Sequence, residues 1–262
     1  MRKDLLRGRH ALVTGASSGL GADFARELAG RGADLTLVAR REPLLRRLAG
    51  ELAAAHGTGV EVVVCDLTGP GAPERLHRGT EGAGLPVDVL VNNAGYGLYG
   101  HFAELDWERQ RNMLELDVLV PVHLTKLFLP GMLGRGFGFV LNLASIGAYQ
   151  PSPRYAVYSA AKSFVLSFTE ALSYELRGTG VSATALSPGI VATEFLRVSG
   201  QQATRYQRLA MMRSPTVARI GVDAMLKGRP SLVAGRLNAA SAWSNRLLPR
   251  RLSVATADRL MR

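Results

Sequence analysis

The sequence has 262 residues, 47% of them hydrophobic, a formal net charge of +11 and one cysteine, Cys65. This length suits one large domain, the apolar content excludes a largely disordered chain, and a lone cysteine excludes a disulfide framework, which favours a reducing, cytoplasmic compartment. No apolar run approaches the ~18 residues of a membrane span, and the basic N-terminus lacks the apolar segment of a secretory signal.

The first two-thirds of the chain alternates apolar strand-like runs with segments of helical periodicity. Continuous apolar strands separated by helices predict a parallel sheet that is covered on both faces. We therefore expect an α/β fold, a Rossmann-type doubly wound parallel sheet in three α/β/α layers and a single domain. The expected strands are 10–15, 33–40, 60–67, 87–95, 138–145 and 181–189, and the expected helices are 20–32, 42–57, 107–133 and 155–178.

The segment TGASSGLG, residues 14–21, falls where the first strand should pass into the first helix. Its glycines allow a tight turn and close approach of a ligand to the backbone, and the helix N-terminus presents N–H groups to a pyrophosphate. The spacing G-x-x-x-G-x-G differs from the common G-x-G-x-x-G. The cofactor is expected to contact Gly15, Ser17, Ser18, Gly19, Leu20 and Gly21.

The second expected strand ends in Val-Ala-Arg, which places Arg40 where an NAD-binding fold would carry an acid for the ribose 2′-hydroxyl. An Arg there favours a 2′-phosphate, so NADP(H) is the expected cofactor, with Arg41 assisting. Alternatively, Arg40 and Arg41 merely begin a solvated helix. The next two strands also end in ligand-compatible residues, namely Asp66 and Leu67 for the adenine and Asn92, Ala94 and Gly95 beside the cofactor.

Further along, Ser145 ends the fifth expected strand, and the next helix contains Tyr158 and Lys162 one turn apart. Reduction of a carbonyl by hydride requires a proton for the developing alkoxide, and a nearby ammonium lowers the pKa of a phenol that must exchange it. A serine hydroxyl can orient the substrate oxygen. These three residues therefore predict acid/base chemistry on a carbonyl or an alcohol. The five histidines show no metal-ligand spacing, so no metal is expected.

Taken in order, TGASSGLG, Asp66, NNAG, Ser145, YSAAK and SPG resemble the short-chain dehydrogenase/reductase family over roughly residues 8–195. The strand ending in Ala-Arg is similar to its NADP(H)-preferring acyl- and steroid-reductase subgroup. The resemblance implies that Tyr158 is the general acid/base, that Lys162 is its partner and a ribose ligand, and that a mobile lid follows residue 193. It also implies homodimers or homotetramers and cofactor contacts from Pro188, Gly189, Val191 and Thr193.

One position departs from the family pattern. The family commonly has Asn in the helix before the serine strand, with a main-chain carbonyl that holds a water near the catalytic lysine, whereas this chain has Asp117. If only the main-chain carbonyl at this position is needed, the replacement of Asn by Asp changes little. If an amide donor is needed, Asp cannot supply it, and an ionised Asp would weaken the effect of Lys162 on Tyr158. Asp117 is therefore included among the expected catalytic residues.

The last 68 residues carry the charge excess. Residues 1–194 hold 19 basic and 19 acidic residues, whereas residues 195–262 hold 13 Lys and Arg against two Asp. We expect residues 1–194 to form the dinucleotide-binding and catalytic core, residues 195–236 to supply a substrate lid and the last core elements, and residues 237–262 to form a basic amphipathic tail. Such asymmetry fits an anionic partner, but a solvated basic tail explains it equally well.

The lid and the tail each mix apolar and basic residues. Either the lid accepts a lipophilic substrate with an anionic handle, or its apolar residues simply pack a helix. Its mixed residues are Phe195, Leu196, Leu209, Met211 and Met212 with Arg205, Arg208 and Arg213. The tail either makes a weak contact with an anionic membrane surface or covers a subunit interface, and Pro249 breaks any single long helix. Its mixed residues are Trp243, Leu247, Leu248 and Leu252 with Arg246, Arg250 and Arg251.

The expected function is that of an NADP(H)-dependent oxidoreductase that interconverts a carbonyl and a secondary alcohol, on a lipophilic, acyl- or steroid-like small molecule. Two rival hypotheses are a catalytically weak NADP-binding sensor or scaffold, for which Asp117 is the support, and a basic membrane-surface protein. Although basic charge also suits nucleic acid, no nucleic-acid partner is expected for a chain with this ordered set of motifs.

Overall fold

The computed structural model describes residues 5–245 and 249–261. Within them, seven parallel strands form one sheet in the order β3-β2-β1-β4-β5-β6-β7. The strands are β1 (His10–Thr14), β2 (Asp34–Ala39), β3 (Val60–Val64), β4 (Val89–Asn92), β5 (Gly138–Leu143), β6 (Val181–Ser187) and β7 (Ser231–Val233). The expected Rossmann-type α/β fold is confirmed, and β7 adds an edge strand that the sequence pattern did not predict.

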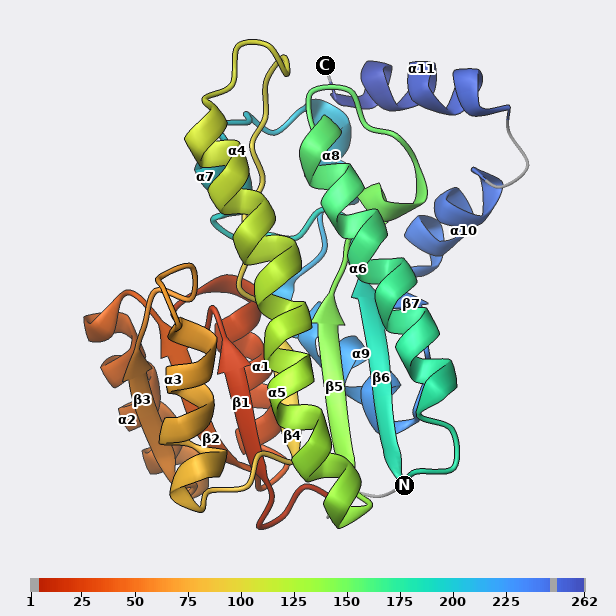
Figure 1. The fold of residues 1–262 in the computed structure, drawn as a ribbon. Helices are drawn as coiled ribbons and strands as arrows, with labels where there is room; N and C mark the ends of the chain where they lie inside the picture. Colours follow the sequence, from red (N-terminus) through yellow and green to blue (C-terminus); the bar gives the residue numbers. More distant parts are fainter. Residues whose placement is uncertain (1–4, 246–248, 262) are drawn as a thin grey trace.

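Helices cover both faces of the sheet, as Figure 1 shows. One layer contributes Phe24, Leu45 and Val217 to a large core cluster. The other contributes Leu76 and Leu124, together with Leu172, to a second cluster on the opposite face. The first layer comprises α1 (Gly19–Ala29), α2 (Glu42–His56) and α9 (Ser214–Leu226), and the second comprises α3 (Ala72–Gly79), α5 (Val120–Arg135) and α6 (Ala156–Glu175).

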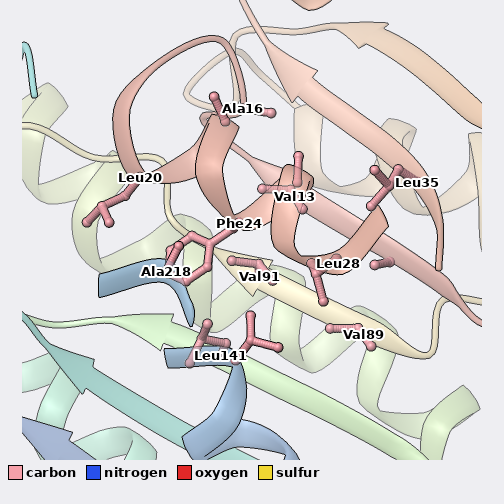
Figure 2. Packing of buried hydrophobic residues seen from close by; sticks show 14 of the residues in the cluster. Val13, Ala16, Leu20, Phe24, Leu28, Leu35, Val89, Val91, Leu141 and Ala218 are labelled. Atoms are coloured by element: carbon pink, nitrogen blue, oxygen red, sulfur yellow. The ribbon is translucent and has the colours of Figure 1, made fainter. Parts of the chain in front are cut away.

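The strands alternate their side chains between these two clusters. In β4, Val89 and Val91 face the first cluster and Leu90 faces the second. Figure 2 shows Phe24 and Leu28 of α1 lying over Val91 and Val89. Because the central strands are covered on both faces, they are largely apolar, which is why the sequence reads as hydrophobic runs; the edge strand β3 is partly exposed and contains Glu61.

A long helical segment runs from Trp107 to Arg135 and lies in front of the sheet in the view of Figure 1. It consists of α4 (Trp107–Leu114), a π-helical turn at Glu115–Leu119 and α5. Its length and mean hydropathy of 1.4 would suit a membrane span, but α5 also packs on α3, β4 and β5 as the core helix of an α/β domain does. The π turn lies where Asp117 faces α6.

The C-terminal part of the described chain consists of short helices around the carboxyl edge of the sheet. These are α7 (Phe195–Ser199), α8 (Arg205–Ala210), α10 (Arg236–Ser244) and α11 (Arg250–Met261), with α9 and β7 between α8 and α10. The separate helices α10 and α11 flank Pro249, as expected from its helix-breaking character. Arg246, Leu247 and Leu248, which were expected to belong to the amphipathic tail, lie outside the described residues.

Candidate active site

The site lies where the order of the strands reverses, beyond the carboxyl ends of β1 and β4. In doubly wound sheets this edge is the usual place for a ligand. A cleft of about 630 Å³ opens there. The expected cofactor ligands that line it are Gly15, Ser17, Ser18, Gly19, Leu20, Gly21, Arg40, Asp66, Leu67, Ala94, Gly95, Tyr158, Lys162, Pro188, Gly189, Val191 and Thr193.

The glycine turn is shaped so that side chains would not fit. Gly15 has φ 66° and Gly19 has φ 55°, both in the left-handed region that glycine tolerates best. A Cβ at Gly21 would lie 2.2 Å from the carbonyl oxygen of Gly15. The turn therefore presents bare backbone and the N-terminus of α1 to the cleft, which fits a pyrophosphate.

Hydrogen bonds between Thr14 and the segment after β4 hold this turn in place. The Thr14 hydroxyl accepts hydrogen bonds from the backbone N–H groups of Asn93 (2.9 Å) and Ala94 (3.0 Å). The Asn93 amide donates to the Thr14 carbonyl at 2.9 Å. These bonds join the ends of β1 and β4 and fix the distance between the glycine turn and the NNAG segment. Asn93, which the sequence reading did not single out, lines the cleft.

Asn92, by contrast, does not line the cleft and is 6% exposed. Its amide donates to Asn142 Oδ1 at 2.8 Å and to Thr125 Oγ1 at 3.2 Å, and the Asn142 amide donates to Thr169 at 2.9 Å. This chain of buried hydrogen bonds links β4, β5, α5 and α6. The Asn92 side chain therefore lies in the core and not in the cleft, because the side chains of a strand alternate between faces.

Arg40 and Asp66 lie together on the rim of the cleft at the ends of β2 and β3. The Arg40 guanidinium lies 3.6 Å from Asp66 Oδ2, and the Arg40 side chain is 72% exposed. Partial burial works against ionisation of Asp66, but hydrogen bonds from Thr68 and the charge of Arg40 outweigh it and lower the Asp66 pKa. A charged acceptor thus stands at the end of the cleft where an adenine amine is expected.

Arg41 is held more closely than Arg40. Its guanidinium donates to Ser18 Oγ at 2.5 Å, to Ser17 Oγ at 3.2 Å and to Glu194 at 2.9 Å. Hydrogen bonds from Arg41, Ser18 and Arg197 lower the pKa of Glu194. Arg41 therefore connects the glycine turn to the first residues of the lid and faces two hydroxyls that suit a phosphate.

At the other end of the cleft, Ser145, Tyr158 and Lys162 lie together. Ser145 and Tyr158 both line the cleft, and the Ser145 hydroxyl interacts with the Tyr158 phenol so as to oppose the rise that burial causes in the Tyr158 pKa. The Lys162 ammonium lies 5.7 Å from the centre of the Tyr158 ring and donates to the carbonyl oxygen of Leu143 at 3.0 Å. β5 supplies the carbonyl, the 3-10 turn at Ile146–Tyr149 begins beyond Ser145, and α6 carries the Tyr–Lys pair.

Asp117 lies behind this group, outside the cleft lining, and forms an ion pair with Lys162 across 3.0 Å. The Asp117 side chain has no exposed surface and that of Lys162 is 6% exposed. Burial raises the pKa of Asp117, and the charge of Lys162 and the Tyr96 N–H oppose this rise. Burial, followed by the negative charge of Asp117, also raises the pKa of Tyr158 above its usual value.

Aromatic rings form the substrate side of the cleft. Phe195 of α7 lies 5.4 Å from the Tyr158 ring and stacks on Tyr155 at 6.4 Å. Burial raises the pKa of Tyr155 to about 12, and its single hydroxyl hydrogen is shared between two acceptors, Ser199 Oγ at 2.8 Å and Gln201 Oε1 at 2.9 Å. Tyr155 therefore serves as a wall that ties the lid to α6, and Tyr158 alone of this pair has Lys162 one turn away.

The lid does not place the expected arginines in the cleft. Phe195 and Leu196 line it, but Arg208 and Arg213 are exposed elsewhere, and Met211 and Met212 are also absent from the lining. The side chains of Arg205 and Leu209 lie outside the described part of the structure. The basic lining residues are Arg40, Arg41, Arg109, Lys162 and Arg197. Arg208 and Arg213, two of the arginines expected to hold an anionic handle, therefore do not line the cleft, because Arg208 on α8 and Arg213 just before α9 are turned to solvent.

The cleft thus combines a backbone cradle for a pyrophosphate with a buried phenol, a hydroxyl and an ammonium. A phenol beside a serine hydroxyl can pass a proton to a substrate oxygen that both groups reach. No cluster of three or more His, Cys, Asp or Glu side chains suited to a metal occurs among the described residues. Proton transfer beside a bound dinucleotide is the chemistry that this arrangement supports.

Comparison with known proteins agrees with this class of site. Residues 9–204 match the family model described as "short chain dehydrogenase". The very-long-chain 3-oxoacyl-CoA reductase of Anas platyrhynchos is 34% identical over 197 residues, which is 73% of this chain but 62% of that protein. The fold and the site define a nicotinamide-dependent oxidoreductase. In particular, the chain belongs to the short-chain dehydrogenase family.

Two solved structures show the likeness in three dimensions. A short-chain dehydrogenase from Sphingobium yanoikuyae in complex with NADPH superimposes with a TM-score of 0.79 at 27% identity, covering 91% of this chain and 94% of that one. A family member from Burkholderia phymatum in complex with NAD gives a TM-score of 0.82, also at 27% identity, over 91% and 92%. Both forms of the dinucleotide therefore occur among similar structures.

Proposed function

We propose that this protein is an NADP(H)-dependent oxidoreductase that interconverts a carbonyl and a secondary alcohol on a lipophilic small molecule, with Tyr158 as the general acid/base. The observation that carries the proposal is a single cleft, lined at one end by the bare glycine turn and at the other by Ser145, Tyr158 and Lys162. Both partners of a hydride transfer can thus be bound in contact with each other.

The preference for the phosphorylated cofactor rests on Arg41 together with Ser17 and Ser18. These side chains offer a guanidinium and two hydroxyls beside the expected position of the adenosine ribose. When bound, a reduced nicotinamide cofactor would supply the hydride that adds to the carbonyl carbon. The glycine turn would hold its pyrophosphate, and Lys162 is the group within reach of the nicotinamide ribose.

The remaining steps belong to the protein. Ser145 donates a hydrogen bond to the substrate oxygen and orients it, and Tyr158 gives its proton to that oxygen as negative charge develops. The new O–H bond forms as the phenolic O–H bond breaks, and the resulting phenolate is stabilised by Lys162. In the reverse direction the phenolate removes the proton from the alcohol.

A lipophilic substrate is supported by the aromatic wall of Tyr155 and Phe195 beside Tyr158. The name of the duck relative, a very-long-chain 3-oxoacyl-CoA reductase, points to the same chemical class. Rings and aliphatic lid residues exclude water from the reacting oxygen, which strengthens each of its hydrogen bonds.

The test is NADPH oxidation with a panel of ketones and keto esters, measured for the wild type and for Tyr158→Phe. We expect the wild type to turn over at least one lipophilic member, and Tyr158→Phe to lose about 10²–10⁴ of kcat while still binding NADPH. Tight binding of NADPH without turnover of any compound would instead support the sensor or scaffold. Equal rates for wild type and Tyr158→Phe would remove Tyr158 from the mechanism.

A further inference from the structure

The wall of the cleft beyond Ser145 is formed partly by Gln150, the residue that directly follows the 3-10 turn and begins the loop to α6. The helices α10 and α11, which we call the C-terminal arm, follow the segment matched by the family model. α10 packs on this 3-10 turn. The arm therefore meets the substrate side of the cleft from outside the segment that the family model matches.

Asn245, directly after α10, makes the closest contact. Its amide nitrogen donates to Gln150 Oε1 at 2.7 Å and to the carbonyl oxygen of Ser241 at 3.1 Å. A backbone carbonyl can only accept, so this second bond fixes which end of the Asn245 amide is nitrogen. Ser253 of α11, which is 4% exposed, donates to Asn245 Oδ1 at 2.9 Å and completes the same orientation.

This chain of hydrogen bonds determines how Gln150 is presented. Because Gln150 Oε1 accepts from Asn245, its amide nitrogen is the end turned away from the arm. An amide nitrogen carries two donors and no acceptor. Gln150 lines the cleft, and its amide nitrogen, which takes no part in the contact with Asn245, is the group of this side chain available to donate there.

A second contact holds the same loop a few residues later. Arg154 has φ 66°, a left-handed conformation that a non-glycine residue adopts only when its surroundings hold it. Its guanidinium donates to the Tyr99 hydroxyl at 2.8 Å, and its carbonyl accepts from Gly100 at 3.0 Å. The hydrogen bond to Tyr99 raises the pKa of Arg154, and Asp258 on α11 contributes in the same direction.

We propose that the C-terminal arm, through Asn245, orients Gln150 as a donor for substrates that carry a second acceptor oxygen close to the reacting carbonyl. Asn245 is a positioning residue and Gln150 determines specificity. The proposal rests on the function proposed above. It adds a chemical constraint on the substrate, since a plain ketone leaves the Gln150 donor without a partner and an oxo ester satisfies it.

A matched pair of ketones tests this directly. Ethyl 3-oxohexanoate and nonan-4-one have the same number of chain atoms on either side of the reacting carbonyl, and only the ester offers the second acceptor. We expect the wild type to prefer the ester in kcat/KM. Asn245→Ala should reduce this preference about 3- to 10-fold through KM for the ester, with kcat and the KM for NADPH unchanged.

Two further variants separate orientation from folding. Asn245→Asp keeps the size and the acceptor for Ser253 but cannot donate to Gln150 Oε1, so it should lose the preference as Asn245→Ala does. Ser244→Ala is the control, because this exposed hydroxyl donates to the same Ser241 carbonyl without contacting Gln150. An unchanged ester-to-ketone ratio in both Asn245 variants overturns the proposal, as does a wild type without any preference.

A binding measurement tests the role of the arm independently of whether the protein catalyses the proposed reaction. Each ketone is titrated into NADPH-loaded Tyr158→Phe, and the fluorescence of bound NADPH is followed. A preference for the ester that depends on Asn245 supports the role of the arm even if the wild type turns over neither compound. Equal affinities for the two ketones, or binding of neither, overturn it.

Discussion

The carboxylate of Asp117 and the ammonium of Lys162 lie 3.0 Å apart in a buried ion pair behind the Tyr158 phenol. Without Asp117, the positive charge of Lys162 would lower the Tyr158 pKa with no negative charge to oppose it. Burial raises the Tyr158 pKa, and Asp117 raises it further, so the phenol stays protonated well above neutral pH. Carbonyl reduction requires the protonated phenol, which donates the proton, whereas alcohol oxidation requires the phenolate, which accepts it.

Asp117→Asn should therefore shift the balance between the two directions. Removing the negative charge leaves Lys162 free to stabilise the phenolate, which lowers the Tyr158 pKa. We expect kcat/KM for alcohol oxidation at neutral pH to rise severalfold and its pH profile to move toward lower pH, and carbonyl reduction to fall earlier as pH rises. Rates of both directions from neutral to alkaline pH measure this. Superimposable profiles would show that Asp117 does not act on Tyr158.

Arg41 is expected to carry the preference for NADPH. Arg41→Ala should lower kcat/KM with NADPH about 10- to 100-fold and leave the value with NADH nearly unchanged, because a charge-assisted contact contributes about 1.5–3 kcal/mol. Arg46→Ala is the control, since Arg46 lies exposed on α2 and pairs only with Glu42 among its described ion-pair partners. Equal losses with both cofactors would contradict this role.

Alanine substitution of two glycines on neighbouring helices should have opposite effects on the free energy of unfolding. A Cβ at Gly21 would collide with the Gly15 carbonyl, so Gly21→Ala should abolish NADPH binding and reduce the free energy of unfolding by about 1–3 kcal/mol. A Cβ at Gly50, inside α2, would meet nothing within 4 Å, so Gly50→Ala should stabilise the protein by about 0.5–1 kcal/mol. Urea unfolding and NADPH titration check both.

Asn92 and Asn93 should separate stability from cofactor binding. Asn92→Ala removes a donor from Asn142 inside the core and should cost about 1–3 kcal/mol in unfolding free energy, with the KM for NADPH unchanged. Asn93→Ala releases the turn at Thr14, so its main effect should be a higher KM for NADPH. The reverse pattern would return the cofactor contact to Asn92.

The sequence predicted most of the fold because its central strands are buried on both faces and therefore stand out as apolar runs. The strand ends meet at one edge of the sheet, as parallel strands require, and this brings Ser145 to the helix with Tyr158 and Lys162. The core position of the Asn92 side chain had a signal in the sequence, because Asn92 lies two residues after Leu90 and therefore on the same face, and Leu90 faces the core under α5 and α6. The side chain cannot reach the cleft from that face.

Other features depend on contacts between residues far apart in the chain. Arg41 meets Glu194 across 153 positions, and Gln150 meets Asn245 across 95. Sequence periodicity predicts only contacts between residues a few positions apart. These two pairs are brought together by loops and by the order of the strands. The orientation of Arg208 and Arg213 was missed for the same reason, since composition shows that a lid is basic but not which way its helix turns.

The lid leaves and rejoins the domain at one point. A parallel bridge pairs Val191 with Met212, where the Ala192 N–H donates to the Met212 carbonyl at 3.0 Å and the Met212 N–H to the Ile190 carbonyl at 2.8 Å. The segment between them is an insert whose two ends are already joined, so its length and sequence can change without straining β6 or α9. Exchange of the part of this segment that follows Glu194, by recombination or by design, would change the substrate side of the cleft while leaving Thr193, the Arg41–Glu194 pair and the rest of the cofactor side in place.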